Sequence, residues 1–206
     1  MWRARNSTRA GWPPRRALAS ARVAATARAA ATDGYQASGL PPESVRFDYE
    51  GELALVIGKP GRRIPREAAL SHVAGWTPFL DGSIRDWQRH TAQFTPGKNF
   101  DSSGAIGPEL VPAEAFGDYK AHDLTTRVNG EVLQHTPISL MLFDAETLIH
   151  YISTFTQLRE GDVIATGTCG GVGEKRDPQR WLKPGDVVEV EVSGVPILSN
   201  PVAAEG

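Results

Sequence analysis

Closely spaced turn signals constrain the fold of this chain more than any other feature of its sequence. From about Pro41 onward, apolar and polar residues alternate in short runs, and glycine, proline, asparagine or aspartate separates one run from the next. Alternation with a period of two is typical of β-strands with two unlike faces. Many short strands with few helices favour a mixed roll or barrel over a doubly wound sheet. We therefore expect a β-rich α+β domain over residues 41–206.

A hairpin is the clearest local prediction. Asn129 and Gly130 accept the positive φ angles of a type I′ turn, so residues 124–128 and 131–134 should pair on either side of them. Turn residues also introduce or end the other apolar runs. The remaining expected strands are residues 45–57, 73–81, 105–111, 163–165 and 187–192.

Two short helices are expected among these strands. Asp144 is a candidate N-cap for a helix whose apolar face carries Leu148, Ile149 and Ile152, because these residues follow at three- and four-residue spacing. A shorter helix should start near Pro65, since proline suits the first turn of a helix. Neither helix is long enough to make this a helical protein.

The first 32 residues differ in composition from the rest of the chain. They hold seven of the 22 basic residues and no acid, so the remainder carries 15 basic against 24 acidic residues, a net charge of −9. Three interpretations stay open: an organelle transit peptide, a disordered basic tail, or translation from a misplaced start or shifted frame. A secretory signal fits less well, because arginines interrupt the alanine-rich stretch. We treat residues 1–40 as an atypical, non-native or disordered segment.

Composition also excludes several classes of function. An acidic body is a poor partner for nucleic acid and suits cation binding better. The single cysteine, Cys169, excludes an internal disulfide framework and a cysteine-based zinc cluster. No run approaches the ~20 apolar residues of a membrane-spanning helix. We expect a cytoplasmic protein without a membrane partner, with organelle targeting by residues 1–32 as the alternative.

Acidic residues occupy alternate positions in the segment FDYEGELALVIG. In an extended strand, Asp48, Glu50 and Glu52 project from one face and the apolar residues after them from the other. Neighbouring carboxylates repel each other unless water or a cation neutralises them. Either a metal site or a solvated strand face accounts for this pattern.

A fourth acid, Asp81, ends an expected apolar strand in the segment LDGSIRDWQ. Arg85 and Gln88 follow at helical spacing, so a short turn of helix would keep the three side chains together. The alternative is that Asp81 only caps this turn, with Arg85 as its ion-pair partner on the surface.

Two glycine-containing loops add candidate anion contacts. Lys98, in TPGKNFD, is either a surface charge or a cation that stabilises a developing enolate or carboxylate. The loop ATGTCGGVGEK could bind an anion through its backbone amides and the Thr168 hydroxyl. Its spacing matches neither the Walker pattern nor the dinucleotide fingerprint, so nucleotide binding is not expected.

Taken in order, these segments resemble the fumarylacetoacetate hydrolase family. The resemblance covers about residues 40–202 and rests on FDYEGELALVIGK, LDGSIRDWQ, FTPGKNFDSSGAIGPELV, and LREGDVIATGTCGGVGEK with WLKPGDVVEVEVSGVPILSN. It implies the mixed β-roll of the family's C-terminal catalytic domain, usually a homodimer, with Mg²⁺ or Mn²⁺ as cofactor and Ca²⁺ in some members. Hard cations of this kind prefer oxygen ligands.

The resemblance also implies roles for individual residues. It implies a hydrolase or isomerase, or a decarboxylase, acting on small 2-oxo or 2,4-dioxo acids or their enols, such as acylpyruvates or hydroxymuconate-type intermediates of aromatic degradation. Lys98 would offset charge on the enolate in such a reaction. The implied metal ligands are Glu50, Glu52 and Asp81, and the implied substrate contacts are Lys98 beside the oxo-acid, Arg85 and Gln88 at its polar groups, and Thr168 at its carboxylate.

The N-terminal part of the chain departs from the family pattern. Members that cleave carbon–carbon bonds usually bring a histidine and a glutamate from an N-terminal lid. The present sequence has no histidine before His72, and His90, the one histidine near the motif residues, is expected on the surface. Cys169 stands where relatives commonly have proline and is interpreted as tolerated packing. A catalytically impaired metal-binding family member is therefore the alternative to an active enzyme.

Overall fold

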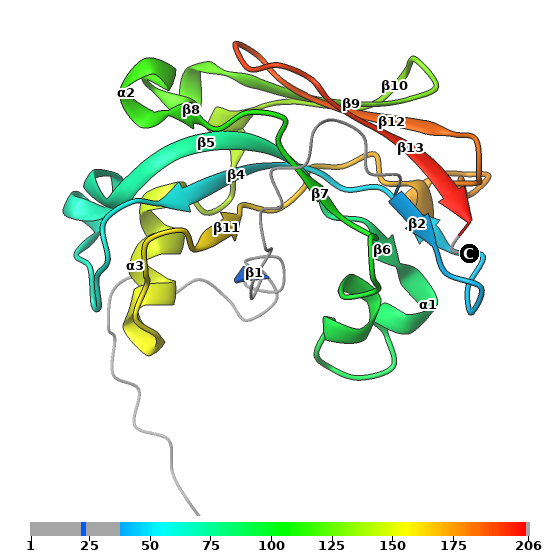
Figure 1. Cartoon of the computed structure of the whole chain (residues 1–206), viewed down its shortest axis with the longest axis horizontal. Coiled ribbons are helices and arrows are strands. Elements are labelled where there is room, and N and C mark those ends of the chain that lie inside the picture. The colour runs from blue at the N-terminus through cyan, green and yellow to red at the C-terminus, as the bar shows by residue number, and fades with distance from the viewer. Residues whose placement is uncertain (1–21, 24–37, 205–206) are drawn as a thin grey trace, which may run out of the picture.

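Two curved sheets lie one over the other and form a half-open roll (Figure 1). The structure, a computed structural model, describes residues 22–23 and 38–204. The expectations for residues 1–40 therefore lie almost entirely outside the described residues. Within the described part of the chain, no helix is long and apolar enough to cross a bilayer.

The first sheet carries the predicted acidic strand at its centre. Its strands follow the order β1-β11-β4-β5-β7, β8 also pairs with β5, and every pairing is antiparallel. The bounds are β1 Arg22–Val23, β4 Gly51–Ile57, β5 Val73–Leu80, β7 Ala105–Ile106, β8 Val111–Pro112 and β11 Val163–Ala165. The central pair, β4 and β5, brings segments 51–57 and 73–80 side by side.

The second sheet contains the predicted hairpin. Its strands follow the order β10-β9-β12-β13-β2, antiparallel except for the parallel pair β13 and β2. The hairpin prediction is confirmed, because Asn129 and Gly130 connect β9 to β10 with φ angles of 53° and 81°. The bounds are β2 Ser38–Leu40, β9 Asp123–Val128, β10 Glu131–Pro137, β12 Val187–Val192 and β13 Leu198–Ala204, and a separate pair is formed by β3 Phe47–Asp48 and β6 Ser83–Ile84.

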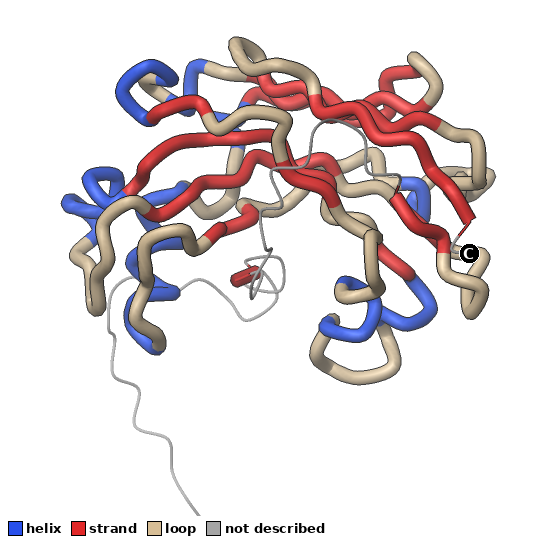
Figure 2. Tube along the Cα trace, in the orientation of Figure 1, coloured by secondary structure: helices blue, strands red, loops and turns tan. Residues whose placement is uncertain are grey.

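Short helical segments lie around the periphery of the strands (Figure 2). The helix predicted after Asp144 is confirmed, since the Asp144 carboxylate accepts a hydrogen bond from the Thr147 amide at 2.9 Å. The helix predicted near Pro65 is present as a 3₁₀ segment. The bounds are α1 Arg85–Gln88, α2 Ala113–Phe116, α3 Ala145–Phe155, η2 Arg66–His72, η3 Thr95–Lys98, η4 Tyr119–Ala121, η5 Ile138–Leu140 and η6 Gly173–Lys175.

The core follows from the alternation along β4. Leu53 and Leu55 are buried in the main apolar cluster together with residues of both sheets and of α3, whereas Ala54 belongs to a smaller cluster on the other face of the strand. Burial of each large aliphatic side chain contributes about 1.5–3 kcal/mol. The hydrophobic face thus fixes the register of β4, and Glu52 lies on the opposite face.

Two expectations about strands are wrong, and two further strands were not predicted. Residues 45–57 do not form one strand. The Asp48 carboxylate accepts a hydrogen bond from the Tyr49 amide, and the segment is divided there into β3 and β4. Residues 105–111 are divided into β7 and β8, since Pro108 has no amide hydrogen for a ladder. Strands β2 and β13 were not expected, and their parallel pairing joins residues far apart in the sequence.

Candidate functional site

Three carboxylates converge where β4 begins and β5 ends. One oxygen atom from each of Glu50, Glu52 and Asp81 lies within 4.8 Å of the others. The antiparallel pairing of β4 with β5 causes this meeting, and the Asp81 amide donates to the Glu50 carbonyl at 2.9 Å. The residues expected to bind a metal are therefore brought together, and their role as ligands stays a prediction.

The acidic face of this segment is not solvated. Asp48 is 0% exposed and Glu52 is 2% exposed, so the interpretation as scattered surface acids is wrong. Burial and the neighbouring Asp81 and Glu50 carboxylates raise the pKa of Glu52 well above its usual value. Burial also opposes the ionisation of Glu50, but Lys98 and Arg85 hold the pKa of Glu50 below its usual value.

Lys98 lies inside the carboxylate cluster and not on the surface. Its side chain is 4% exposed, and its Nζ atom lies 2.6 Å from Glu50 Oε2 and 2.5 Å from Asp81 Oδ2. Gly97 permits this position, because a Cβ atom there would lie 2.4 Å from the Gln88 backbone. The sequence TPGK thus places η3 directly against α1 and directs its lysine inward.

Arg85 connects α1 to the same cluster. Its Nε atom donates to Asp48 at 2.8 Å, and its Nη1 atom donates to Glu50 at 2.6 Å and to Gln88 at 3.0 Å. Burial disfavours its charge, but Glu50 and Asp48 outweigh burial and raise the pKa of the guanidinium. The buried Nη2 atom has no hydrogen-bond partner among the described residues.

Two expectations about α1 are corrected by these contacts. Asp81 lies before β6 and is not part of the helical turn, so helical spacing does not bring it to Arg85 and Gln88. Asp81 also does not cap the turn, because the N-cap position is Ile84 and no side chain caps it. The pairing of strands, and not a helix, places Asp81 in the cluster.

The glycine-rich loop after β11 lies against the acidic segment. The Gly167 amide donates to Glu52 Oε2 at 2.8 Å, and the Thr168 hydroxyl donates to the Gly51 carbonyl at 2.8 Å. The hydroxyl proton of Thr168 is therefore used inside the protein. Its predicted contact with a substrate carboxylate would require that bond to open or would use backbone amides of the loop.

Gln134 was not predicted as a site residue, although it holds this arrangement together. Its side chain accepts from the Gly51 amide at 3.0 Å and donates to Thr168 Oγ1 at 2.8 Å and to the Cys169 carbonyl at 3.0 Å. One indication of Gln134 was present in the sequence, because it is an uncharged polar residue on a strand of the predicted hairpin. The sequence contains no indication of which distant segment this amide contacts.

The charges of the cluster do not balance. Four carboxylates, Asp48, Glu50, Glu52 and Asp81, face two cationic groups, Arg85 and Lys98, when all are ionised. The formal excess of two negative charges, carried by oxygen atoms, fits one hard divalent cation. The excess is also consistent with the raised pKa of Glu52.

The histidines of the described residues lie elsewhere. His90 is exposed, as expected, and its ring contacts the ring of Trp87 with centroids 4.7 Å apart. His72 and His150 contact backbone carbonyls at 2.7 Å. Cys169 is partly buried, and burial raises the pKa of its thiol, which disfavours the reactive thiolate. Among the described residues, the hydrogen bonds between side chains of this cluster involve carboxylates, lysine, arginine and glutamine.

Comparison with known protein families shows to which family this chain belongs. The model of the fumarylacetoacetate (FAA) hydrolase C-terminal domain matches residues 12–203. The chain belongs to the fumarylacetoacetate hydrolase family. The expected fold of this family, a strand-rich roll with few short helices, is confirmed by the structure and by its structural neighbours.

Named members of the fumarylacetoacetate hydrolase family are closely similar to this chain. An oxaloacetate tautomerase, FAHD2A, described as mitochondrial, from Bos taurus is 44% identical over 165 residues, which are 79% of this chain and 52% of the relative. The chain thus spans about half the length of the curated relatives it matches. A fumarylacetoacetate hydrolase structure from Exiguobacterium antarcticum has a TM-score of 0.78 and 39% identity, covering 83% of this chain and 62% of that one.

One structural neighbour was solved with ligands. The fumarylpyruvate hydrolase from Pseudomonas aeruginosa, in complex with Mn²⁺ and pyruvate, has a TM-score of 0.73 and 32% identity. The similarity covers 82% of this chain and 72% of that one. A family member of the same fold therefore holds a divalent metal and a 2-oxo acid.

Proposed function

We propose that this chain carries the active site of a metal-dependent hydrolase or isomerase that acts on small 2-oxo or 2,4-dioxo acids or their enols. The charge excess of the cluster formed by Asp48, Glu50, Glu52 and Asp81 carries the proposal, because it suits a divalent cation. The tautomerase name of a 44% identical relative supports oxaloacetate as the first substrate to test. The reaction would move a proton between carbon 3 and the oxygen on carbon 2.

The proposed metal ligands are Glu50, Glu52 and Asp81, with Mg²⁺ or Mn²⁺ as the cation and Ca²⁺ as a further candidate. Two of these carboxylates already share the Lys98 ammonium as a positive partner. A bound divalent ion would polarise the oxo oxygen of the substrate as a Lewis acid. The Mn²⁺ complex of the Pseudomonas aeruginosa neighbour supports this assignment.

The other residues of the cluster would bind the substrate and stabilise its charge. Arg85 is the best-supported contact. Its buried Nη2 atom donates no hydrogen bond to any of the described residues. An oxygen atom of the substrate would accept a hydrogen bond from this nitrogen. Gln88 lies beside Arg85. Lys98 would offset negative charge on the enolate, and the loop at Thr168 would contact a carboxylate.

A homodimer is part of the proposal. Leu140 and Leu142 are 72% and 75% exposed, and both line a cavity of about 220 Å³ with mainly apolar walls. Large exposed apolar residues that lie together mark surfaces that bind other proteins. The segment around η5 is therefore the surface that we assign to the partner subunit.

Calorimetry and turnover test this function separately. Mn²⁺ should bind to the wild type, and Glu50→Ala should weaken binding at least about tenfold. Purified protein should accelerate the decay of the oxaloacetate enol, followed by its ultraviolet absorbance, and a chelator should abolish the effect. Equal metal affinity of wild type and Glu50→Ala would contradict the ligand set. Metal binding without turnover of oxaloacetate, acylpyruvates or hydroxymuconates would indicate the catalytically impaired alternative.

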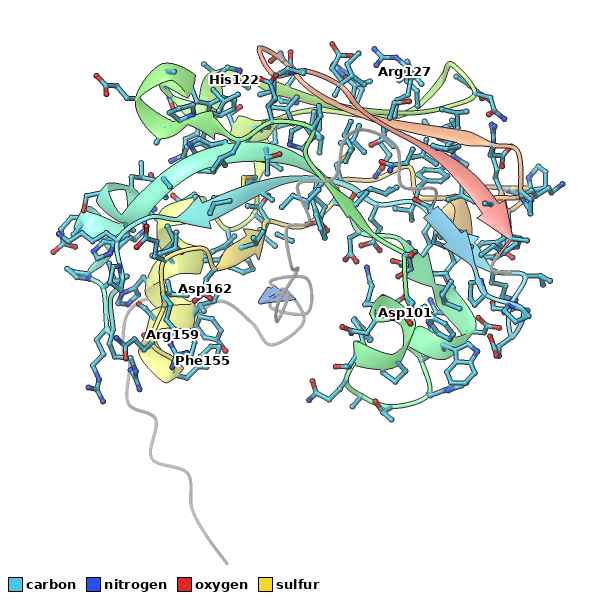
Figure 3. All side chains as sticks on the ribbon, in the orientation of Figure 1. Asp101, His122, Arg127, Phe155, Arg159 and Asp162 are labelled. Carbon is cyan, nitrogen blue, oxygen red and sulfur yellow. The ribbon has the colours of Figure 1, made fainter. Side chains whose placement is uncertain are left out.

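Asp162→Asn provides the matched control for both measurements. Asp162 lies at the end of the molecule that carries α3, whereas Asp101 lies beside α1 at the other end (Figure 3). The Asp162 carboxylate accepts a hydrogen bond from the Arg159 amide in an exposed turn. Removing this charge should leave metal affinity and turnover unchanged.

A further inference from the structure

Asp48 has its hydrogen-bonding capacity filled entirely by protein groups. Its Oδ1 atom accepts from the amides of Tyr49 at 2.9 Å and Gly173 at 2.7 Å. Its Oδ2 atom accepts from the Glu174 amide at 2.9 Å and from Arg85 Nε at 2.8 Å. A carboxylate that is completely buried is costly unless it is paired in this way, so the four contacts stabilise one conformation of the surrounding segments.

The four donors come from three different parts of the chain. Gly173 and Glu174 begin η6 within the glycine-rich loop, Arg85 begins α1, and Tyr49 follows β3. The approach of the loop is so close that a Cβ atom on Gly173 would lie 2.7 Å from Asp48 Oδ1 and 1.8 Å from the Arg180 carbonyl oxygen. Asp48 therefore joins the loop to the helix that supplies the substrate contact.

We propose that Asp48 is a positioning residue that fixes the Arg85 guanidinium and the glycine-rich loop to each other at the edge of the carboxylate cluster. Asp48 holds Nε, while Glu50 and Gln88 hold Nη1. The remaining nitrogen, Nη2, is kept in one place for an anionic group of the substrate. This inference rests on the proposed function, because it needs an oxo-acid bound beside Arg85.

Asp48→Asn separates the charge from the shape of this side chain. Asparagine retains one acceptor for the Tyr49 and Gly173 amides, but its NH₂ group would face the Glu174 amide and Arg85 Nε, which are both donors. Two favourable contacts would thus become unfavourable. Both the loop and Arg85 should then move away from their present positions.

The experiment compares two ligands on the full chain. Mn²⁺ affinity is measured by calorimetry, and then oxalate, a planar dianion whose oxygen atoms resemble those of a pyruvate enolate, is titrated into the Mn²⁺-loaded protein. We expect Asp48→Asn to weaken oxalate binding at least about tenfold, the effect of losing one charge-assisted hydrogen bond. Mn²⁺ affinity should change less than about threefold, because the three ligands remain.

Two further variants connect the effect to Arg85. Arg85→Lys should weaken oxalate binding by a similar factor, and the double variant should be no weaker than Arg85→Lys alone, since residues that act through one contact are not additive. Ser153→Ala, which removes a buried hydroxyl that accepts from the Ile64 amide and donates to the His150 carbonyl, is the structural control. It should lower thermal stability without changing oxalate affinity.

Hydrogen exchange provides a measurement that needs no ligand. Peptides covering residues 170–176 should exchange faster in Asp48→Asn than in the wild type, because the Glu174 amide loses its acceptor and the loop moves away from its present position. Unchanged oxalate affinity in Asp48→Asn would overturn the inference and leave the proposed function standing. Equal losses of Mn²⁺ and oxalate affinity would also overturn it, because they indicate general damage. A wild type that binds neither ligand would overturn the proposed function and this inference together.

Discussion

The Lys98 ammonium lies 2.5 Å from Asp81 Oδ2, although the two residues are 17 positions apart, Asp81 directly after β5 and Lys98 at the end of η3. The same nitrogen lies 2.6 Å from Glu50 Oε2. One lysine thus neutralises part of the charge of two carboxylates that are proposed to hold a metal. Lysine and the proposed metal would stabilise the same pair of carboxylates, so removal of one should increase dependence on the other.

Lys98→Met should make folding dependent on metal. Loss of one partner from a buried ion pair costs about 3–5 kcal/mol, because the remaining carboxylates stay buried without their cation. A divalent ion that binds only the folded state would restore stability as its concentration rises. Thermal melts with and without Mn²⁺ measure this, and the metal should raise the melting temperature of the variant more than that of the wild type.

Lys183→Met is the control for this experiment, since Lys183 is exposed in a turn before β12. It should melt like the wild type at every Mn²⁺ concentration. A Lys98→Met protein that gained no more from Mn²⁺ than the wild type would contradict the shared role of lysine and metal.

Gly97→Ala should damage the site although the substitution adds only one methyl group. The added Cβ would lie 2.4 Å from backbone atoms of Gln88, which cannot move aside as a flexible side chain could. Overpacking of this kind costs about 1–3 kcal/mol and should push η3, and with it Lys98, away from α1. Urea unfolding and oxaloacetate turnover measure the two effects.

Gly170→Ala is the matched control in the other glycine-containing loop, because a Cβ there would meet nothing within 4 Å. Its stability should equal or slightly exceed that of the wild type, as alanine reduces the entropy of the unfolded chain. Equal stability of the two alanine variants would contradict the packing argument.

Asp144→Ala should lower stability in a pH-dependent way. Burial opposes ionisation of this N-cap, but hydrogen bonds from Thr147 and the charges of Arg66 and Lys120 lower the pKa of Asp144 below its usual value of 3.8. The ionised group therefore stabilises the folded state above that value, and the contribution is lost as the pH falls through the lower folded-state pKa. The cost should be about 1 kcal/mol at neutral pH and smaller in acid.

Asp144→Asn separates the cap from the charge, because asparagine is also a good N-cap. It should cost less than alanine at neutral pH, and the two variants are compared by urea unfolding between neutral and acidic pH. A destabilisation by Asp144→Ala that grew as the pH fell would have the wrong sign for a lowered pKa.

Leu140→Glu combined with Leu142→Glu should give a monomer. Placing charges in an apolar interface costs far more than exposing them to water, so the proposed homodimer would dissociate while the fold remains. Light scattering after size exclusion measures the mass. Val45→Glu, at another strongly exposed apolar position, is the control and should leave the mass unchanged. A wild type that is already monomeric would contradict the dimer.

Local patterns predicted the parts of this fold that depend on neighbours in the sequence. The alternation of Glu52 and Leu53 predicted the two faces of β4, and Asn129 and Gly130 predicted the turn of the hairpin. Asp144 predicted the start of α3. Each of these signals acts over a few residues, where propensity and periodicity apply.

Contacts between distant segments were beyond such patterns. The break between β3 and β4 depends on the Asp48 side chain. This side chain accepts hydrogen bonds from Gly173 in η6, 125 positions away, and from Arg85 in α1, 37 positions away. Gln134 contacts Gly51 from 83 positions away. The sequence predicted the acids that converge in the cluster, but it gave no indication of the contact between Gln134 and Gly51.

Gln134 has a wider consequence, because it belongs to β10 of one sheet while the backbone that it holds belongs to the other. The spacing of the carboxylates is thereby tied to the distance between the two layers of the roll. Substitutions in the apolar interior, such as at Val190, should therefore alter ligand affinity without touching a charged residue. In this protein, a change in the packing between the two sheets is therefore also a change in the geometry of the carboxylate cluster.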